Sequence, residues 1–166
     1  MKKLFMAALF MLIFSLAGLC SAGNLYPDHL NGDANYILCD GHMGVGWYLQ
    51  RDSVKKEENI EGNSVISFNL LTVYDAGKDN MEIKSRTHYR MLFESGKGLA
   101  MYVLDSSGGK HYMDPNGPSS QTRPLMPAGE IAYYVLYGDK FYGYKYNEFG
   151  SAVFDDDFYR KAEKII

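Results

Sequence analysis

The sequence predicts an α+β domain: an antiparallel β-sheet of about five to six strands, a C-terminal α-helix packed on one face, and a short terminal helix. Two observations lead to this fold class. Apolar and polar residues alternate with a period of two in the segments before residue 105, which is typical of strands. From Pro127 onward, apolar residues recur at the spacing of an amphipathic helix. Strands followed by helices favour a sheet with one covered face, whose other face meets water or a partner.

The strand segments are short and separated by turn residues. Residues 64–74 are the clearest of them, because Ile66, Phe68 and Leu70 fall on one face while the opposite face is more mixed. A Ser-Gly-Lys-Gly turn at residues 95–98 joins the next two strands into an antiparallel hairpin. The predicted strands are residues 35–40, 45–51, 64–74, 83–93, 99–104 and 111–113.

The main helix is predicted to begin at Pro127, because proline suits the first helical position, and Glu130 suits the positive end of the helix dipole. Its apolar stripe consists of Ile131, Tyr134, Val135, Gly138, Phe141 and Tyr142. Gly138 on this stripe would let the helix approach the sheet closely. A last amphipathic helix is predicted over residues 155–166, and we interpret its three opening aspartates as a charged helix start rather than a calcium loop.

Residues 1–22 have the pattern of a secretory signal peptide. Lys2 and Lys3 precede an apolar run, and small residues follow it, so cleavage is predicted after Ala22. The run is shorter than the ~20 residues of a membrane-spanning helix, so we expect no membrane span after cleavage. An uncleaved anchor and a lipidated Cys20 are the alternatives, although Leu19 does not suit lipidation. The expected location is the periplasm, the cell surface or the extracellular space.

The remaining chain has the length of one domain. Residues 23–34 are predicted as a flexible lead-in and residues 35–166 as a single α+β domain. A net charge of −3 argues against nucleic acid as a partner. Cys39 is the one cysteine after the leader, which excludes an intramolecular disulfide. We interpret it as a small buried residue rather than a reactive thiol.

Sequence motifs for catalysis are absent. The chain has no Gly-x-Ser-x-Gly elbow, no phosphate-binding glycine loop and no His-Glu-x-x-His motif. Its histidines lack a second histidine or a cysteine at metal-ligand spacing. Asp40 and His42 could orient an imidazole beside a carboxylate, but turn residues explain them equally well. We therefore predict no catalytic residue, no metal site and no cofactor.

The best candidate for binding is a row of basic residues in the fourth predicted strand. Lys84, Arg86, His88 and Arg90 alternate along residues 83–93, so they would form a row about 20 Å long on one face. Such a row can meet a sulfated glycan, an anionic polymer or an acidic protein surface. The alternative is a solvated face whose cations pair with nearby carboxylates.

The stretch Trp-Tyr-Leu-Gln-Arg-Asp-Ser-Val at residues 47–54 resembles the aromatic-x-x-x-Asp-Ser-hydrophobic segment of surface-adhesin protein E-like domains. In that family a long strand, a strand pair and a proline-led helix follow, similar to residues 65–74, 85–104 and 125–144 here. The resemblance implies a small exported envelope or surface domain with an antiparallel sheet, a C-terminal helix and an adhesion or binding role. The chain departs from the family in lacking a paired cysteine bridge and a fitting lipid anchor, and no binding residue is carried over.

The expected function is therefore that of an exported bacterial cell-envelope or surface binding module, adhesin-like and non-enzymatic. Its expected partners are an anionic glycan or a host or envelope protein. Two alternatives stay open. One is a periplasmic structural protein that self-associates as a homodimer through a sheet face or edge. The other is an envelope enzyme or enzyme inhibitor whose site is assembled from distant residues.

Overall fold

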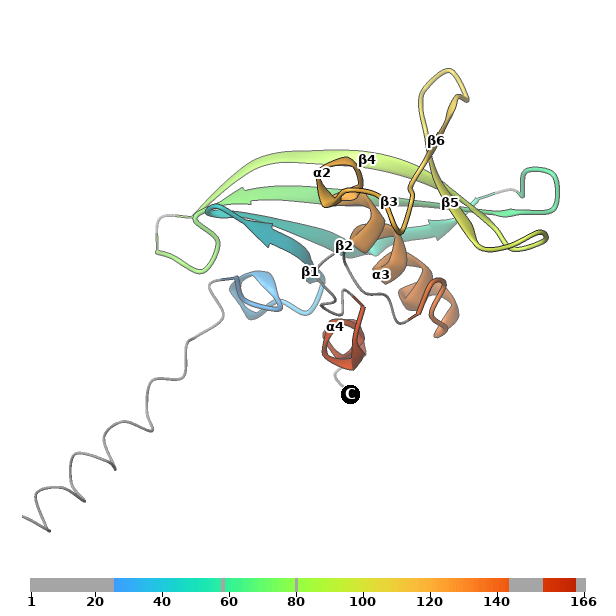
Figure 1. Ribbon diagram of the computed structural model, residues 1–166. Coiled ribbons are helices and arrows are strands. Elements are labelled where there is room, and N and C mark those ends of the chain that lie inside the picture. Colours follow the sequence, from blue (N-terminus) through green and yellow to red (C-terminus); the bar gives the residue numbers. More distant parts are fainter. Residues whose placement is uncertain (1–25, 58, 80, 144–153, 164–166) are drawn as a thin grey trace, which may run out of the picture.

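The computed structural model describes residues 26–57, 59–79, 81–143 and 154–163. Within these residues, six strands form one antiparallel sheet in which each strand lies beside its neighbour in sequence (Figure 1). The strands are β1 (Tyr36–His42), β2 (Val45–Lys56), β3 (Ser64–Tyr74), β4 (Glu82–Glu94), β5 (Ala100–Leu104) and β6 (Lys110–Tyr112). The described helices are the 3-10 turn η2 (Leu30–Gly32), α2 (Ser119–Thr122), α3 (Leu125–Tyr137) and α4 (Asp156–Arg160). The predicted α+β fold class is confirmed.

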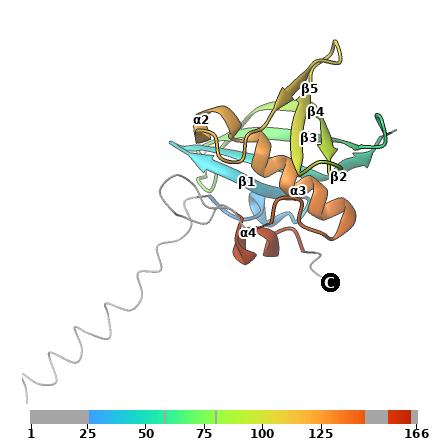
Figure 2. The same ribbon diagram turned by 45° about the vertical axis from the view of Figure 1, so that its right-hand side comes forward.

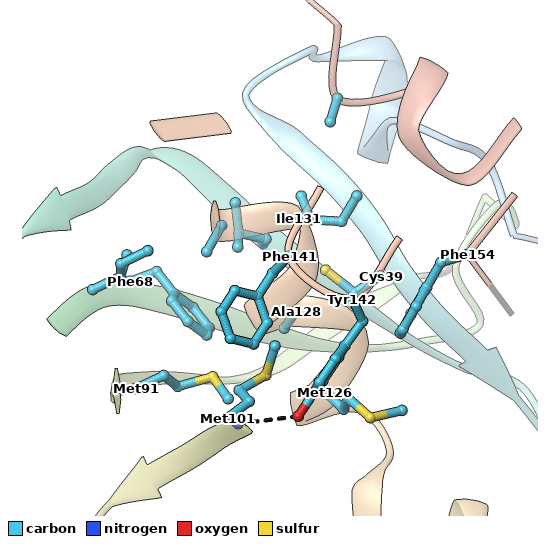
Figure 3. Close-up of a cluster of buried hydrophobic side chains, with 14 of the residues drawn as sticks. Cys39, Phe68, Met91, Met101, Met126, Ala128, Ile131, Phe141, Tyr142 and Phe154 are labelled. Carbon is cyan, nitrogen blue, oxygen red and sulfur yellow. Dashed lines mark hydrogen bonds between the residues drawn. The ribbon is translucent and has the colours of Figure 1, made fainter. Parts of the chain in front are cut away.

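The helix α3 lies across one face of the sheet, where it contacts β1, β2, β3 and β5 (Figures 1 and 2). Ala128 and Ile131 of α3 are fully buried in one cluster with Phe68 of β3 and Met91 of β4 (Figure 3). Full burial of a side chain such as that of Ile131, Phe68 or Met91 contributes ~1.5–3 kcal/mol. This cluster is the main core of the protein.

The start and the glycine of α3 differ from the prediction. The helix begins at Leu125, and Pro127 lies in its first turn. The N–H groups of the first turn have no partner within the helix, so the N–H that proline lacks costs no helical hydrogen bond. The glycine that permits close approach is Gly129, because a Cβ atom there would lie 2.7 Å from the Sδ atom of Met101. Gly138 instead ends the helix with a φ of 70°, a left-handed conformation that glycine adopts easily. The prediction that Gly138 faces the sheet is wrong.

Glu130, which the sequence predicted only as a carboxylate near the start of the helix, is completely buried. It accepts hydrogen bonds from the backbone N–H groups of Phe141 (2.9 Å) and Tyr142 (3.1 Å) and from the Tyr159 hydroxyl (2.6 Å). Burial raises the pKa of Glu130, and the hydrogen bonds oppose that rise without cancelling it. Through these hydrogen bonds, Glu130 connects α3 to the segment that follows it and to Tyr159 of α4.

The face of the sheet opposite α3, called the outer face from here on, is partly covered. Leu30 of η2 is 2% exposed and belongs to a buried cluster with Tyr48 of β2, against which Tyr26 also packs. Part of the predicted flexible lead-in, residues 23–34, is therefore packed on the sheet, because Tyr26 and Leu30 bury apolar surface there. Residues 23–25 lie outside the described part.

The terminal helix α4 is shorter than its predicted range. Asp155 is its N-cap and accepts a hydrogen bond of 2.8 Å from the backbone N–H of Phe158. The next two aspartates occupy the first turn, which confirms the interpretation of a charged helix start. Residues 164–166 of the predicted helix and the predicted signal peptide, residues 1–22, lie outside the described residues.

Candidate functional site

The structure places the predicted basic row on β4 and keeps three of its members together. Arg86, His88 and Arg90 alternate along the strand on the outer face. Their cross-strand neighbours on β3 are Leu71, Asn69 and Ser67. All three residues of β4 are exposed. Along the middle of the outer face, His88 and Arg90 therefore border polar side chains of β3, whereas Arg86 borders the buried apolar side chain of Leu71.

Lys84 does not belong to this row. The register between β3 and β4 shifts at this point, because Thr72 pairs with Ser85 but Val73 pairs with Ile83. Such a bulge adds one residue to a strand and breaks the alternation of faces, which a pattern of every second residue cannot reveal. The Lys84 ammonium lies 2.9 Å from a carboxylate oxygen of Glu82. The predicted row of four is thus a row of three, followed by a separate ion pair.

The three remaining members differ in their partners. Arg90 forms two contacts with the Glu57 carboxylate, through Nε at 2.8 Å and Nη2 at 2.7 Å, and these contacts lower the pKa of Glu57. His88 Nδ1 lies 3.1 Å from Oδ1 of Asn69. Arg86 has neither a hydrogen bond nor an ion pair within the described part of the chain. The alternative of a neutralised face holds for Arg90, whereas Arg86 keeps an uncompensated charge.

The backbone of β4 is also free on one side over this stretch. β5 pairs with β4 only between Arg90 and Glu94, so no described strand flanks the earlier half of β4 on that side. Every residue from Glu82 to His88 is exposed. Figure 1 shows this half of β4 along the upper border of the sheet, with β5 and β6 standing beside the other end. The basic row and an open sheet edge therefore coincide.

A surface pocket of about 290 Å³ lies on the other face, where α2 and the start of α3 meet the β1–β2 hairpin. Its lining consists of Asp40, His42, Trp47, Ser120, Arg123 and Pro124. Arg123 Nε lies 3.2 Å from the buried Oδ2 atom of Asp40, although the geometry is not that of a hydrogen bond. Asp40 Oδ1 accepts from the Gly41 N–H at 2.8 Å. Asp40 therefore attaches the α2–α3 junction to β1 and forms no pair with His42.

Cys39 lies in the main core and is 5% exposed. Burial raises the pKa of its thiol to about 12, so the thiol stays protonated near neutral pH. This confirms the interpretation of a small buried residue. Among the described residues, no group of three or more His, Cys, Asp or Glu side chains is placed to hold a metal ion. No helix in the same residues is long and apolar enough to cross a membrane.

Two residues of the site, Glu57 and Asn69, were not predicted from the sequence. Glu57 fell outside any predicted strand because the second strand was expected to end at Arg51, whereas β2 continues past it through a register shift to Lys56. Asn69 was visible only as a polar interruption of the mixed face of the third strand. Both residues could be assigned to the outer face only once the strand register was known.

Comparison of the chain with protein-family models, with curated proteins and with solved structures finds no match. The resemblance to surface-adhesin protein E-like domains stays a prediction from the residues quoted above. The function of the protein is therefore inferred from the geometry of the site itself.

Proposed function

We propose that the protein is an exported bacterial cell-envelope or surface binding module, adhesin-like and non-enzymatic, which binds an anionic partner at β4. The observation that carries this proposal is Arg86, an exposed guanidinium with no partner among the described residues. It lies between Lys84 and His88 in a stretch that is exposed throughout. A guanidinium in this position can form paired hydrogen bonds to a carboxylate or a sulfate.

Two features of the sequence support the remaining parts of the proposal. The leader pattern of residues 1–22 supports export to the periplasm or the cell surface. The resemblance of residues 47–54 to protein E-like domains supports an adhesin-like role. Because the chain carries a net charge of −3, a polyanion would be repelled by the molecule as a whole. The cations of β4 would then supply a local and salt-sensitive attraction.

The proposal is tested by binding of the purified protein to immobilised heparin and to an immobilised poly-glutamate, two anions of different chemistry. Arg86→Glu is compared with Lys97→Glu, which makes the same change of charge in the exposed β4–β5 turn. We expect Arg86→Glu to weaken binding about tenfold or more, a loss of about 1.4 kcal/mol. Lys97→Glu should have little effect, and added salt should weaken the wild-type interaction.

The proposal is wrong if neither anion binds at low ionic strength. It is also wrong if the two variants lose affinity equally, because the attraction would then be a property of the overall charge and not of β4.

A further inference from the structure

We propose that the free edge of β4 receives an extended acidic peptide segment of a partner protein as an additional antiparallel strand. This inference rests on the proposed function, because it names the kind of partner and the way in which β4 would bind it. It joins two observations that concern the same residues: an unpaired backbone edge and a row of cations beside it. Peptide recognition by strand addition uses these two elements, backbone hydrogen bonds for affinity and side chains for specificity.

The hydrogen bonds of β3 determine which backbone groups of β4 are free. Asn69 donates its N–H to Ser53 Oγ at 2.8 Å, and the Val65 carbonyl accepts from the Glu57 N–H at 2.9 Å. Both partners lie on the β2 side of β3. In an antiparallel sheet, successive residues direct their backbone polar groups to opposite sides of the strand. The odd-numbered residues of this part of β3 therefore face β2, and the even-numbered residues face β4.

The same alternation continues into β4. The β4 partners of the even-numbered residues Phe68, Leu70 and Thr72 are Tyr89, Thr87 and Ser85. These three residues direct their backbone groups toward β3. The residues between them, Arg86 and His88, therefore direct their N–H and C=O groups away from β3, toward the side that no described strand occupies. Two exposed members of the basic row, Arg86 and His88, therefore also have backbone groups that no described strand pairs.

β5 supplies an independent check of this direction. The Met101 carbonyl accepts from the Met113 N–H, so Met101 and the other odd-numbered residues of β5 face away from β4. Leu104 then faces β4, where its partner is Arg90. Arg90 is two positions beyond His88 and therefore points to the same side. An added strand would continue the line that β5 leaves at Leu104.

The side chains around this edge favour an acidic strand. Residues of a bound strand directly opposite Arg86 and His88 would have their side chains on the outer face, next to the guanidinium and the imidazole. Two acidic residues separated by one position would therefore meet both groups. The intervening residue would lie on the face of Thr87. The bulge at Lys84 interrupts regular pairing, so the usable edge runs from Ser85 to Tyr89.

The same charges disfavour a second copy of this chain as the occupant. Antiparallel pairing of two identical β4 edges centred on Arg86 would place one guanidinium against the other. Pairing centred on Ser85 would place Lys84 against Arg86, and pairing centred on Thr87 would place Arg86 against His88. Like charges directly opposite each other destabilise a strand pair. Basic residues and a bulge are also features that protect an edge against self-association.

The test uses the purified protein and a fluorescent, capped peptide Thr-Val-Glu-Val-Asp-Val-Thr, with binding followed by fluorescence anisotropy. Two N-methylated forms of this peptide are the decisive probes. Methylation of the Glu and Asp backbone nitrogens removes the N–H groups that would donate to β4. Methylation of the flanking valine nitrogens alters N–H groups that would point away. We expect the first form to bind at least tenfold more weakly and the second to bind within about twofold of the parent.

Two variants of the protein test the same geometry from the other side. His88→Pro removes an N–H that β3 does not use, whereas His88→Gln changes the side chain and keeps the N–H. We expect His88→Pro to lose at least tenfold more affinity than His88→Gln, while circular dichroism shows both variants folded. Arg86→Glu should prefer a peptide in which lysines replace the two acidic residues.

The outcomes separate this inference from the proposed function. If heparin binds through Arg86 but the peptide does not, the partner is a glycan, so the inference is overturned and the proposed function stands. If both N-methylated peptides bind equally well, the contact is made by side chains alone and strand addition is excluded. If neither heparin, poly-glutamate nor the peptide binds, the inference and the proposed function fail together.

Discussion

The two halves of β4 belong to one continuous strand but lie in different environments. From Glu82 to His88 every residue is exposed, and no strand among the described residues pairs with one edge of the backbone. From Met91 to Phe93 every residue is at most 3% exposed, and both edges are paired. The difference arises from the position at which β5 ends and from the side chains themselves, which change from charged to apolar. In β4, the change from accessible surface to core therefore coincides with the start of pairing with β5 at Arg90.

The largest expected effect distinguishes the halves by stability. Phe93 is 3% exposed, and its ring lies 5.2 Å from that of Tyr133 and 5.1 Å from that of Phe141, measured between centroids. Phe93→Ala should lower the free energy of unfolding by about 3–5 kcal/mol. Thr87→Ala, in the exposed half, should change it by less than about 0.5 kcal/mol. Urea denaturation measures both values, and similar losses would show that the halves do not differ in burial.

The next effect concerns the close contact of α3 with the buried half. A Cβ atom at Gly129 would lie 2.9 Å from both Cε and Sδ of Met91. Gly129→Ala should therefore destabilise the fold by about 1–3 kcal/mol, toward the lower value because methionine side chains can move. Gly96→Ala is the control, because a Cβ there meets nothing within 4 Å. Thermal unfolding compares the two, and an unchanged melting temperature for Gly129→Ala would mean that α3 is not in close contact with the sheet.

A smaller effect concerns the buried carboxylate of α3. Because burial raises the pKa of Glu130, the folded protein binds this proton more tightly than the unfolded chain. Its contribution to stability is complete below the unfolded pKa and declines as the pH rises through the folded pKa. In Glu130→Gln that decline should be absent. Urea denaturation of both proteins between about pH 4 and 7 gives the test, and a wild-type-minus-variant difference that rises with pH would contradict the assigned direction.

The smallest effect lies where the two halves meet, at the Arg90–Glu57 ion pair. The two side chains are 43% and 28% exposed, so solvent screens their attraction. A double-mutant cycle with Arg90→Gln and Glu57→Gln should give a coupling of less than about 1 kcal/mol. Because the pair lowers the pKa of Glu57, the coupling should be present above the unfolded pKa and disappear as the pH falls through the folded pKa. A coupling that persists in acid would assign it to another contact.

The sequence predicted the period of the strands but not the register between them, and it extended the helical stripe to Tyr142, whereas α3 ends at Tyr137. The strand at residues 64–74 coincides with β3, because its alternation is regular and turns bound it. The position of Lys84 was not predictable, since the bulge depends on how β4 pairs with β3. Gly129 and Gly138 could not be distinguished because both lie in one helical pattern, and only the packing of α3 on the methionines of the sheet separates them.

The candidate site shows the same difference between features that the sequence predicts and features that need the strand pairing. The cations of β4 were recognisable from residue type and spacing alone. The free edge was not, because it depends on where β5 stops pairing, at Arg90. Glu57 was missed for a related reason: it reaches Arg90 through a continuation of β2 that local patterning does not indicate. Properties of single strands can be predicted from the sequence, whereas properties of strand pairs require the fold.

Amide hydrogen exchange measured residue by residue with NMR tests the central claim most directly. In the free protein, the N–H groups of Arg86 and His88 should exchange quickly, while those of Ser85 and Thr87, bonded to β3, should exchange slowly. Addition of the acidic peptide should slow exchange at Arg86 and His88 and leave Ser85 and Thr87 unchanged. Slow exchange at Arg86 and His88 in the free protein, or no change at these two amides with bound peptide, would contradict the account.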